Sequence, residues 1–439
     1  MKKIYIFLSF CVFLGGSEVK FEGNLPELIL AAQSSNLAQI SNYEPQKAQL
    51  QKDAVKSAYM PSLRVEGGYS FLSGDINVLR PQRAATARAI LELAVYDGGK
   101  REALLSSLSH LSAAEILKNE DYQNLLAFNA TKLYFSFLSL GELATAKEGE
   151  INYLKNALNR LEKYYRAGLS DESEYEAINA RYAMALAERL EITQNQNEIK
   201  NQIYALTGRD IKPVAGSRIA FLDDENSAPQ KSAKPELEAL SLNFAAALED
   251  EKITASETNP QIFIKNTYTF MRTHYDRNLL PAQYRSALEP YFDDFFKPNL
   301  NTNELILGFS WKAFDFGANK KRREIKRINA LQAKLNLDQK RLQNELNLAN
   351  IKNDLKTLEQ KIAAGESALN SAQTSLNAVS KKYEAGLLGY VEFLNATAQS
   401  FSAGSALELS KSKFEIKKAE YLYERGGKIA ENIEKTERK

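Results

Sequence analysis

The chain has 439 residues, of which 44% are hydrophobic and 26% charged, and its 57 basic and 55 acidic side chains leave a net charge of +2. This composition excludes a polytopic helical membrane protein, which needs repeated apolar runs of about 20 residues, and it excludes a disordered chain. The near-neutral charge gives no reason to expect a nucleic-acid partner. The only cysteine is Cys11 and the only histidines are His110 and His274, so zinc sites, disulfides and cysteine nucleophiles are almost excluded and no cofactor is expected.

The N-terminus has the pattern of a secretory signal peptide. Two lysines at positions 2 and 3 precede an apolar run over residues 4–14, and small residues follow at 15–17. This run is too short to span a bilayer, and the order of basic, apolar and small residues predicts a signal peptide over 1–17. Cys11 leaves a lipid anchor open as an alternative, although Phe10 is bulky for the usual lipoprotein signal. The mature chain is then free of cysteine, which suits an exported protein.

The rest of the chain repeats itself. The sequence Tyr-Arg-Ala-Gly-Leu at 165–169 returns as Tyr-Glu-Ala-Gly-Leu at 383–387, and Pro61 and Tyr69 return at a smaller offset as Pro260 and Tyr268. A repeat of this length indicates an internal duplication rather than a short solenoid array. The change of offset places extra sequence between Phe270 and Phe309, where three prolines (Pro281, Pro290, Pro298) predict a long loop.

Each repeat is expected to contain a helix, two strands and a long helical hairpin. Apolar residues at a mean spacing of 3.5 over many turns indicate coiled-coil packing, and no proline interrupts the region between Pro81 and Pro213 or follows Pro298. The predicted domains are a first repeat at 18–207 (helix 25–58, strands 61–73 and 86–96, hairpin 98–207), a linker at 208–235, a second repeat at 236–426 (helix 236–257, strands 261–273 and 303–314, hairpin 317–426), and a C-terminal tail at 427–439.

The four strand segments each have one apolar and one polar face. In 62–71, for example, Leu63, Val65, Tyr69 and Phe71 alternate with polar or small residues. A length of about ten residues with this alternation is typical of a tilted membrane β-strand, although a small soluble sheet lying on helices remains an alternative. The polar faces carry six charged residues that we expect to line a channel lumen: Arg64, Glu66, Arg88, Glu92, Lys265 and Lys312.

Four strands are too few to close a membrane barrel, because the smallest such barrels have about eight and an open edge in lipid leaves backbone groups unpaired. If the strands lie in a membrane, the chain must therefore oligomerise. Three copies supply a 12-stranded β-barrel continued by an α-helical barrel, so the expected fold class is mainly α with membrane β. A dimer with eight strands also satisfies the count, but its helical tube would be very narrow.

The order and the motifs of these elements resemble the TolC-type outer-membrane efflux family over nearly the whole mature chain. The helix before each strand pair ends in Ala-Tyr-Met-Pro-Ser-Leu at 58–63 and Thr-Asn-Pro-Gln-Ile at 258–262, and each strand pair ends in an Asp-containing turn, at 96–99 and 314–317. The most specific signal is Tyr-x-x-Gly-Leu at both hairpin tips. The resemblance derives its strength from these motifs occurring together, in this order and duplicated.

The resemblance implies a homotrimeric exit duct of a tripartite efflux or type I secretion system. Such a duct lies in outer-membrane lipid, extends through the periplasm, and docks to an inner-membrane pump through a periplasmic adaptor (membrane fusion) protein. It conducts drugs, other small molecules or proteins passively and is not an enzyme; the sequence contains no nucleophile–base constellation and no Gly-x-x-x-x-Gly-Lys motif. The main alternative is a soluble periplasmic coiled-coil adaptor or scaffold.

Two groups of site residues follow. The hairpin tips are the expected docking surface, with the alternative that their glycines only end a helix and their leucines pack beneath the turn; they comprise Gly168, Leu169, Ser170, Gly386, Leu387 and Leu388. The resemblance also implies a periplasmic gate, made of Glu174, Tyr383, Glu392 and Asn395. Leu388 stands where the family has an arginine, and Asn395 where a second carboxylate is frequent. A solvated surface glutamate is the alternative role for Glu392.

Overall fold

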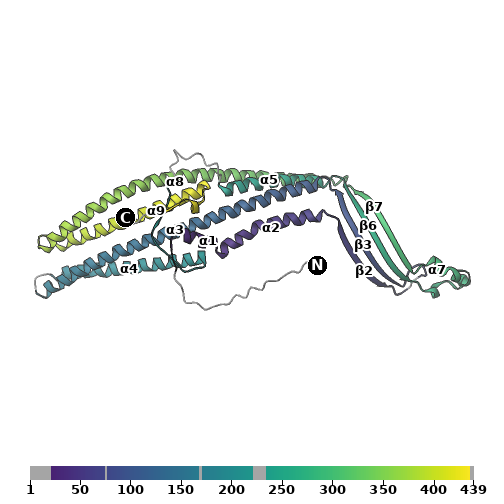
Figure 1. Ribbon diagram of the computed structural model, residues 1–439, viewed down its shortest axis with the longest axis horizontal. Helices are drawn as coiled ribbons and strands as arrows, with labels where there is room; N and C mark the ends of the chain where they lie inside the picture. Colours follow the sequence, from purple (N-terminus) through teal and green to yellow (C-terminus); the bar gives the residue numbers. More distant parts are fainter. Residues whose placement is uncertain (1–20, 75–76, 168–170, 221–233, 436–439) are drawn as a thin grey trace. The chain divides into compact units, whose positions relative to one another are not determined.

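The computed structural model describes residues 21–74, 77–167, 171–220 and 234–435. The predicted signal peptide with Cys11, and the first-tip residues Gly168, Leu169 and Ser170, lie outside these ranges. The chain divides into two compact units, which we describe separately (Figure 1). The first comprises Met1–Tyr43, Leu117–Leu237 and Lys340–Lys439, and the second comprises Glu44–Ile116 and Glu238–Gln339.

The second unit is built on a four-stranded antiparallel sheet in the order β2-β3-β6-β7. The strands of the first repeat thus pair with those of the second through β3 and β6, and β2 and β7 remain as edges (Figure 1). A bulge interrupts the register between Ala94 and Tyr96. The strands are β2 (Ser62–Phe71), β3 (Arg83–Tyr96), β6 (Gln261–His274) and β7 (Asn299–Ser310).

The prediction of the last strand was displaced along the chain. It was expected at 303–314, whereas β7 begins at Asn299 and ends at Ser310. Asn299, Asn301 and Asn303 break the apolar alternation, but backbone pairing with β6 continues through them, from Arg272↔Asn299 to Gln261↔Ser310. The predicted start of β3 was also late, because the strand begins at Arg83 rather than at residue 86.

The long loop predicted between the last two strands contains short helices around a small aromatic core. Phe292 and Leu280 are buried, and Phe296 packs against both Tyr275 and Phe292, with ring centres 4.9 and 4.7 Å apart. The short helical segments are η1 (Arg277–Leu279), η2 (Ala282–Tyr284), α6 (Arg285–Leu288), η3 (Glu289–Tyr291) and α7 (Phe292–Phe295).

Two long helical hairpins follow the strand pairs, and they have matching dimensions. α3 (Lys100–Arg166) and α8 (Ala318–Glu384) each have 67 residues, while α4 (Glu172–Thr207) and α9 (Tyr390–Arg425) each have 36. At 1.5 Å per residue a 67-residue helix is about 100 Å long. The two short helices end in left-handed glycines, Gly208 and Gly426, with φ of 69° and 83°. These equal lengths are what an internal duplication predicts.

Each strand pair is preceded by a helix, α2 (Asn36–Ala58) or α5 (Pro235–Ser256). The single helix predicted at 25–58 is wrong, because a separate helix α1 (Leu25–Gln33) precedes α2. Adjacent serines explain the break. Ser34 closes α1 by donating from Oγ to the Leu30 carbonyl at 2.6 Å, and Ser35 Oγ accepts from the Ala38 N–H at 3.4 Å at the start of α2.

The first unit contains two small sheets that the sequence did not reveal. β1 (Phe21–Gly23) pairs in parallel with β4 (Ile211–Pro213), and β5 (Ser217–Ile219) pairs antiparallel with β8 (Ile433–Lys435). Strands from the predicted linker therefore hold strands near both ends of the described chain. They lie beside a core that includes Leu25, Leu28, Tyr134 and Ile203. Along the residues that the structure describes, no helix is both long and apolar enough for a membrane span.

Candidate functional site

The predicted gate residues lie where the two helical hairpins pack together in the first unit. Tyr383, in the last turn of α8, donates a hydrogen bond from Oη to Glu174 Oε1 at 2.8 Å. Glu174 is in the first turn of α4, so the contact joins the second hairpin to the first. Burial raises the pKa of the Tyr383 hydroxyl, and the hydrogen-bonded Glu174 carboxylate raises it further. The hydroxyl therefore stays protonated and remains a donor at neutral pH.

A stack of three aromatic rings fixes the orientation of Tyr383. Its ring lies 4.7 Å from that of Phe393 on α9, and Phe393 lies 5.3 Å from Tyr153 on α3. Phe393 is only 1% exposed, so this stack forms part of a buried core between the hairpins. The Arg160 guanidinium lies 5.7 Å from the Tyr383 ring centre and forms an ion pair with Glu384 at 3.4 Å. The tyrosine is thus held by stacking, a nearby cation and its hydrogen bond.

Glu392 and Asn395, the other two predicted gate residues, are exposed on the first turns of α9. They flank the buried Phe393 and share a helix face at i and i+3. The Glu392 carboxylate folds back toward Gly389, the residue that precedes α9. Its Oε2 lies 3.0 Å from the position that a Cβ atom would take on that glycine. A carboxylate there also favours the helix N-terminus electrostatically. The structure therefore brings Tyr383 and Glu174 into contact and leaves Glu392 and Asn395 facing solvent.

The tip of the second hairpin has the backbone of a Schellman turn. Gly386 has a φ of 69°, and the N–H groups of Gly386 and Leu387 donate to the carbonyls of Tyr383 and Lys382 at 3.0 and 2.9 Å. This pattern ends a helix with a left-handed residue, which glycine adopts without strain. Leu387 is 74% exposed rather than packed beneath the turn, and Leu388 is half-buried. An apolar side chain is thus presented at the end of this hairpin.

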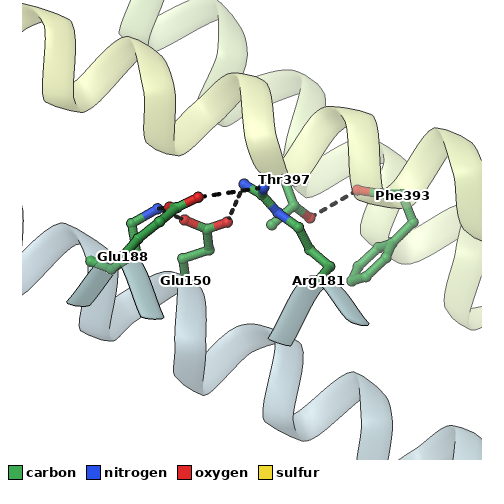
Figure 2. A network of polar contacts seen from close by, with 6 residues as sticks. Glu150, Arg181, Glu188, Phe393 and Thr397 are labelled. Carbon is green, nitrogen blue, oxygen red and sulfur yellow. Dashed lines mark hydrogen bonds and ion pairs between the residues drawn. The ribbon is translucent and has the colours of Figure 1, made fainter. Parts of the chain in front are cut away.

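A buried charged cluster in the first hairpin escaped the sequence reasoning (Figure 2). Glu150 on α3 is 1% exposed, and its carboxylate binds Lys147 Nζ at 2.5 Å and the Arg181 guanidinium at 2.7 Å. Glu188 completes the cluster, binding Lys147 at 2.5 Å and Arg181 at 4.0 Å. Two acids and two bases thus compensate one another between α3 and α4. The signal was a charged residue, Lys147, at a position of the apolar 3-4 ladder of α3.

Five of the six predicted lumen residues share one face of the strand sheet: Arg64, Glu66, Arg88, Glu92 and Lys265. Opposite charges lie in direct register, with Glu66 facing Arg88 and Glu92 facing Lys265. Within β2, Arg64 Nε lies 3.1 Å from Glu66 Oε1. Lys312 does not belong to this face, because β7 ends at Ser310 and the chain has left the sheet. The other face presents exposed apolar residues to solvent, among them Leu63, Val65, Tyr69, Leu305, Leu307 and Phe309.

Comparison with known proteins identifies relatives of this architecture. Residues 230–419 match the family model described as outer membrane efflux protein. Outer membrane protein TolC of Escherichia coli (strain K12) is 22% identical over 395 residues, which span 86% of this chain and 78% of that protein. TolC of Salmonella enteritidis is 20% identical, spanning 89% of this chain and 80% of its own length.

Solved structures share the fold at lower identity. The Campylobacter jejuni CmeC outer membrane channel has a TM-score of 0.78 and 13% identity, with 93% of this chain and 86% of that one covered. The outer membrane protein VceC from Vibrio cholerae has a TM-score of 0.75 and 16% identity, with 92% and 96% covered. These likenesses confirm the predicted fold class, mainly α with a strand sheet and duplicated helix, strand-pair and hairpin units.

The fold and the matched region both resemble outer membrane efflux proteins, and the similar proteins named here are outer membrane proteins and channels rather than enzymes. The resemblance drawn from the hairpin tips and strand turns is therefore confirmed. The chain is similar to the TolC-type outer-membrane efflux proteins, and its expected location in the bacterial outer membrane is confirmed as well.

Proposed function

We propose that three copies of this chain form a passive exit duct that receives drugs, other small molecules or proteins from an inner-membrane pump. The observation that carries the proposal is the four-stranded sheet, which has an exposed apolar face and two open edges, β2 and β7. Because every neighbouring pair is antiparallel, β7 of one copy placed beside β2 of the next continues the same pattern. Three copies then close a 12-stranded barrel that leaves no edge in lipid.

The charged face of the sheet supports a water-filled interior. Arg64, Glu66, Arg88, Glu92 and Lys265 carry both signs, and in a barrel with its apolar face toward lipid they line the lumen. Paired charges of both signs favour a passage of low selectivity. On this reading the duct itself imposes little choice of substrate at the membrane, and the pump and adaptor determine what is exported.

The hairpin ends supply the proposed gate and docking surface. The bond between Tyr383 and Glu174 holds the two hairpins of one copy together and favours a narrowed end. Three copies of the exposed Glu392 would form a ring of carboxylates that attracts cations at this mouth. The exposed side chain of Leu387 supports adaptor docking at the hairpin tips. The proposed docking surface comprises Gly168, Leu169, Ser170, Gly386, Leu387 and Leu388. The proposed domains are the repeats at 18–207 and 236–426, joined by the linker at 208–235.

The test combines fractionation, mass and conductance. We expect the protein to sediment with outer membranes, to need detergent for extraction, to have the mass of a trimer in that detergent, and to form ion-conducting pores in planar bilayers. Loss of the gene should also sensitise cells to at least one exported compound or abolish secretion of one protein. A monomer released into the aqueous periplasmic fraction would instead support the coiled-coil adaptor and overturn the duct.

A further inference from the structure

The apolar face of the β2-β3-β6-β7 sheet ends at a different level on each strand. We define the outer limit as the last apolar residue on this face toward the turn that joins β2 to β3. Beyond it on the same face come polar side chains, such as Arg83 on β3, Arg272 on β6 and Asn303 on β7. The outer limits on the four successive strands are Phe71, Ala85, Phe270 and Leu305.

The strand register converts these limits into a slope. On each strand after β2, the outer limit lies further from the outer end than the residue that pairs with the limit of the preceding strand. The shift has the same direction at every step from β2 to β7. Phe71 pairs with Arg83, two residues before Ala85; Ala85 pairs with Arg272, two residues after Phe270; and Phe270 pairs with Asn301, four residues before Leu305.

Tilted strands in a flat hydrocarbon layer explain such a slope. Strands of membrane barrels tilt by about 35–45°, so a plane parallel to the bilayer crosses neighbouring strands at shifted positions. With strands about 4.8 Å apart and a rise of about 3.3 Å per residue, a tilt of 45° shifts the crossing by about 1.5 residues per strand. A boundary parallel to the register rows would instead put Asn299, Asn301 and Asn303 at the depth of Tyr69, Gly67 and Val65.

We propose that lipid acyl chains contact a slanted band of this face, whose outer edge descends from Phe71 on β2 toward Leu305 on β7, with Asn299 and Asn301 outside it among the polar headgroups. The inference rests on the membrane insertion of the sheet proposed above and assigns a depth to each strand. Apolar exposure supports it at both extremes, since Tyr69 is 69% and Leu307 75% exposed.

A hydrogen-bonded amide pair lies within the proposed band. Asn266 lies on the same face between Ile264 and Tyr268, and its Nδ2 donates to Asn303 Oδ1 at 2.8 Å across β6 and β7. An amide in hydrocarbon is costly unless it is hydrogen-bonded. Tilt alone lowers the hydrocarbon edge by about four to five residues over three strand steps. On β7 this edge then falls between Asn301 and Asn303, so Asn303 lies inside the hydrocarbon edge although it is beyond the apolar limit at Leu305. Asn266 Nδ2 also lies 3.4 Å from the Glu304 carbonyl oxygen, so this donor group is hydrogen-bonded within the sheet.

Tryptophan fluorescence tests the slope, because Trp311 is the only tryptophan of the chain. In a Trp311→Phe background, we would introduce single tryptophans by Tyr69→Trp, Asn299→Trp and Leu307→Trp. Tyr69 and Asn299 occupy the same register row, through Ala85 and Arg272, and Leu307 lies well inside the band on β7. Each purified oligomer would be reconstituted into phosphatidylcholine with or without bromine along the acyl chains, and its conductance measured.

We expect brominated lipid to reduce the fluorescence of the Tyr69→Trp and Leu307→Trp variants at least twofold and to leave the Asn299→Trp variant within about a fifth of its unquenched value. Equal quenching at positions 69 and 299 would overturn the slope, while normal conductance would leave the proposed duct intact. Absence of quenching at position 307 as well would show that the sheet is outside lipid, which overturns both the band and the membrane insertion.

Discussion

Tyr383 and Glu174, more than two hundred positions apart in sequence, are joined by a 2.8 Å hydrogen bond between the end of one long helix and the start of a short one. The bond connects the two halves of the duplication at the ends of their hairpins. Because the Tyr383 ring also stacks on the buried Phe393, the orientation of its hydroxyl toward Glu174 is fixed. This contact is the most direct candidate for holding the hairpins in a narrowed arrangement.

Replacing Tyr383 by phenylalanine should therefore open the duct. Tyr383→Phe keeps the ring stack but removes the donor to Glu174, at a cost of about 1 kcal/mol in closed-state stability. We expect a several-fold rise in the conductance of single pores in planar bilayers. Tyr153→Phe is the matched control, since Tyr153 Oη is buried without a hydrogen-bond partner in the described part of the chain. Unchanged conductance in Tyr383→Phe would remove the bond from the gate.

The same hydroxyl predicts an alkaline transition. Its pKa is raised above the ordinary value of 10.0, chiefly by burial and then by Glu174. Its contribution to stability is therefore fully present below pH 10 and declines as the pH rises above it. The melting temperature of the wild type should fall between pH 10 and 11. That of the Tyr383→Phe variant should fall less over this interval. Identical slopes for both proteins would contradict this assignment.

The buried cluster around Glu150 should be essential for the first hairpin. Glu150→Gln removes the buried one of the two carboxylates that Lys147 and Arg181 share, and removal of one partner of a buried ion pair costs about 3 kcal/mol. We expect a clearly lower melting temperature of the helical circular dichroism signal in detergent. Glu148→Gln is the control, because Glu148 is 58% exposed and pairs with Arg189 at the surface. Equal melting temperatures for both variants would show that the cluster contributes little.

Charged residues at both tips should block export without disturbing assembly. The double variant Leu169→Glu, Leu387→Glu places carboxylates where apolar docking is proposed, and the exposure of Leu387 implies little loss of folding stability. Export should fall to the level of a deletion strain, while the oligomer retains its mobility on native gels. The conservative Leu169→Met, Leu387→Met variant should retain export. Normal export by the glutamate variant would refute docking through these leucines.

The proposed carboxylate ring can be tested in both directions. Glu392→Gln should reduce the cation selectivity of single pores and their block by divalent cations, because it removes the exposed charge from each copy. Asn395→Asp adds a carboxylate on the same face at i+3 and should increase both properties. Selectivity is obtained from reversal potentials in a salt gradient. If neither variant differs from the wild type, Glu392 is an ordinary surface residue at a helix start.

The duplicated plan was predictable because periodicity and motifs are local properties. The ladder of apolar residues and the paired Tyr-x-x-Gly-Leu tips predicted both hairpins, and α3 and α8 extend nearly to those tips. The helix break at Ser34 and Ser35 was missed because serine fits a continuous helix at small cost, whereas their side-chain hydrogen bonds mark the end of α1 and the start of α2 only in the folded structure. Three asparagines hid the start of β7, whose pairing depends on the backbone rather than on side chains.

The site was only partly accessible to sequence reasoning. The resemblance supplied Tyr383, Glu174, Glu392 and Asn395, but nothing local in the sequence indicates that Tyr383 bonds to Glu174 rather than to another acid. That contact depends on how two hairpins pack. The Glu150 cluster was missed although Lys147 interrupts an apolar ladder, because a single charge in a ladder is compatible with a solvated position until its partners on α4 are seen.

The pairing of β5 with β8 has a consequence for the order of folding. Residues 217–219, between the two repeats, find their partner strand only at residues 433–435, and β1 likewise waits for β4. Contacts between such distant parts of a chain form late, because the intervening loop must first be closed. The first unit can therefore be completed only after residues 433–435 are available to pair with β5, near the end of synthesis of the chain.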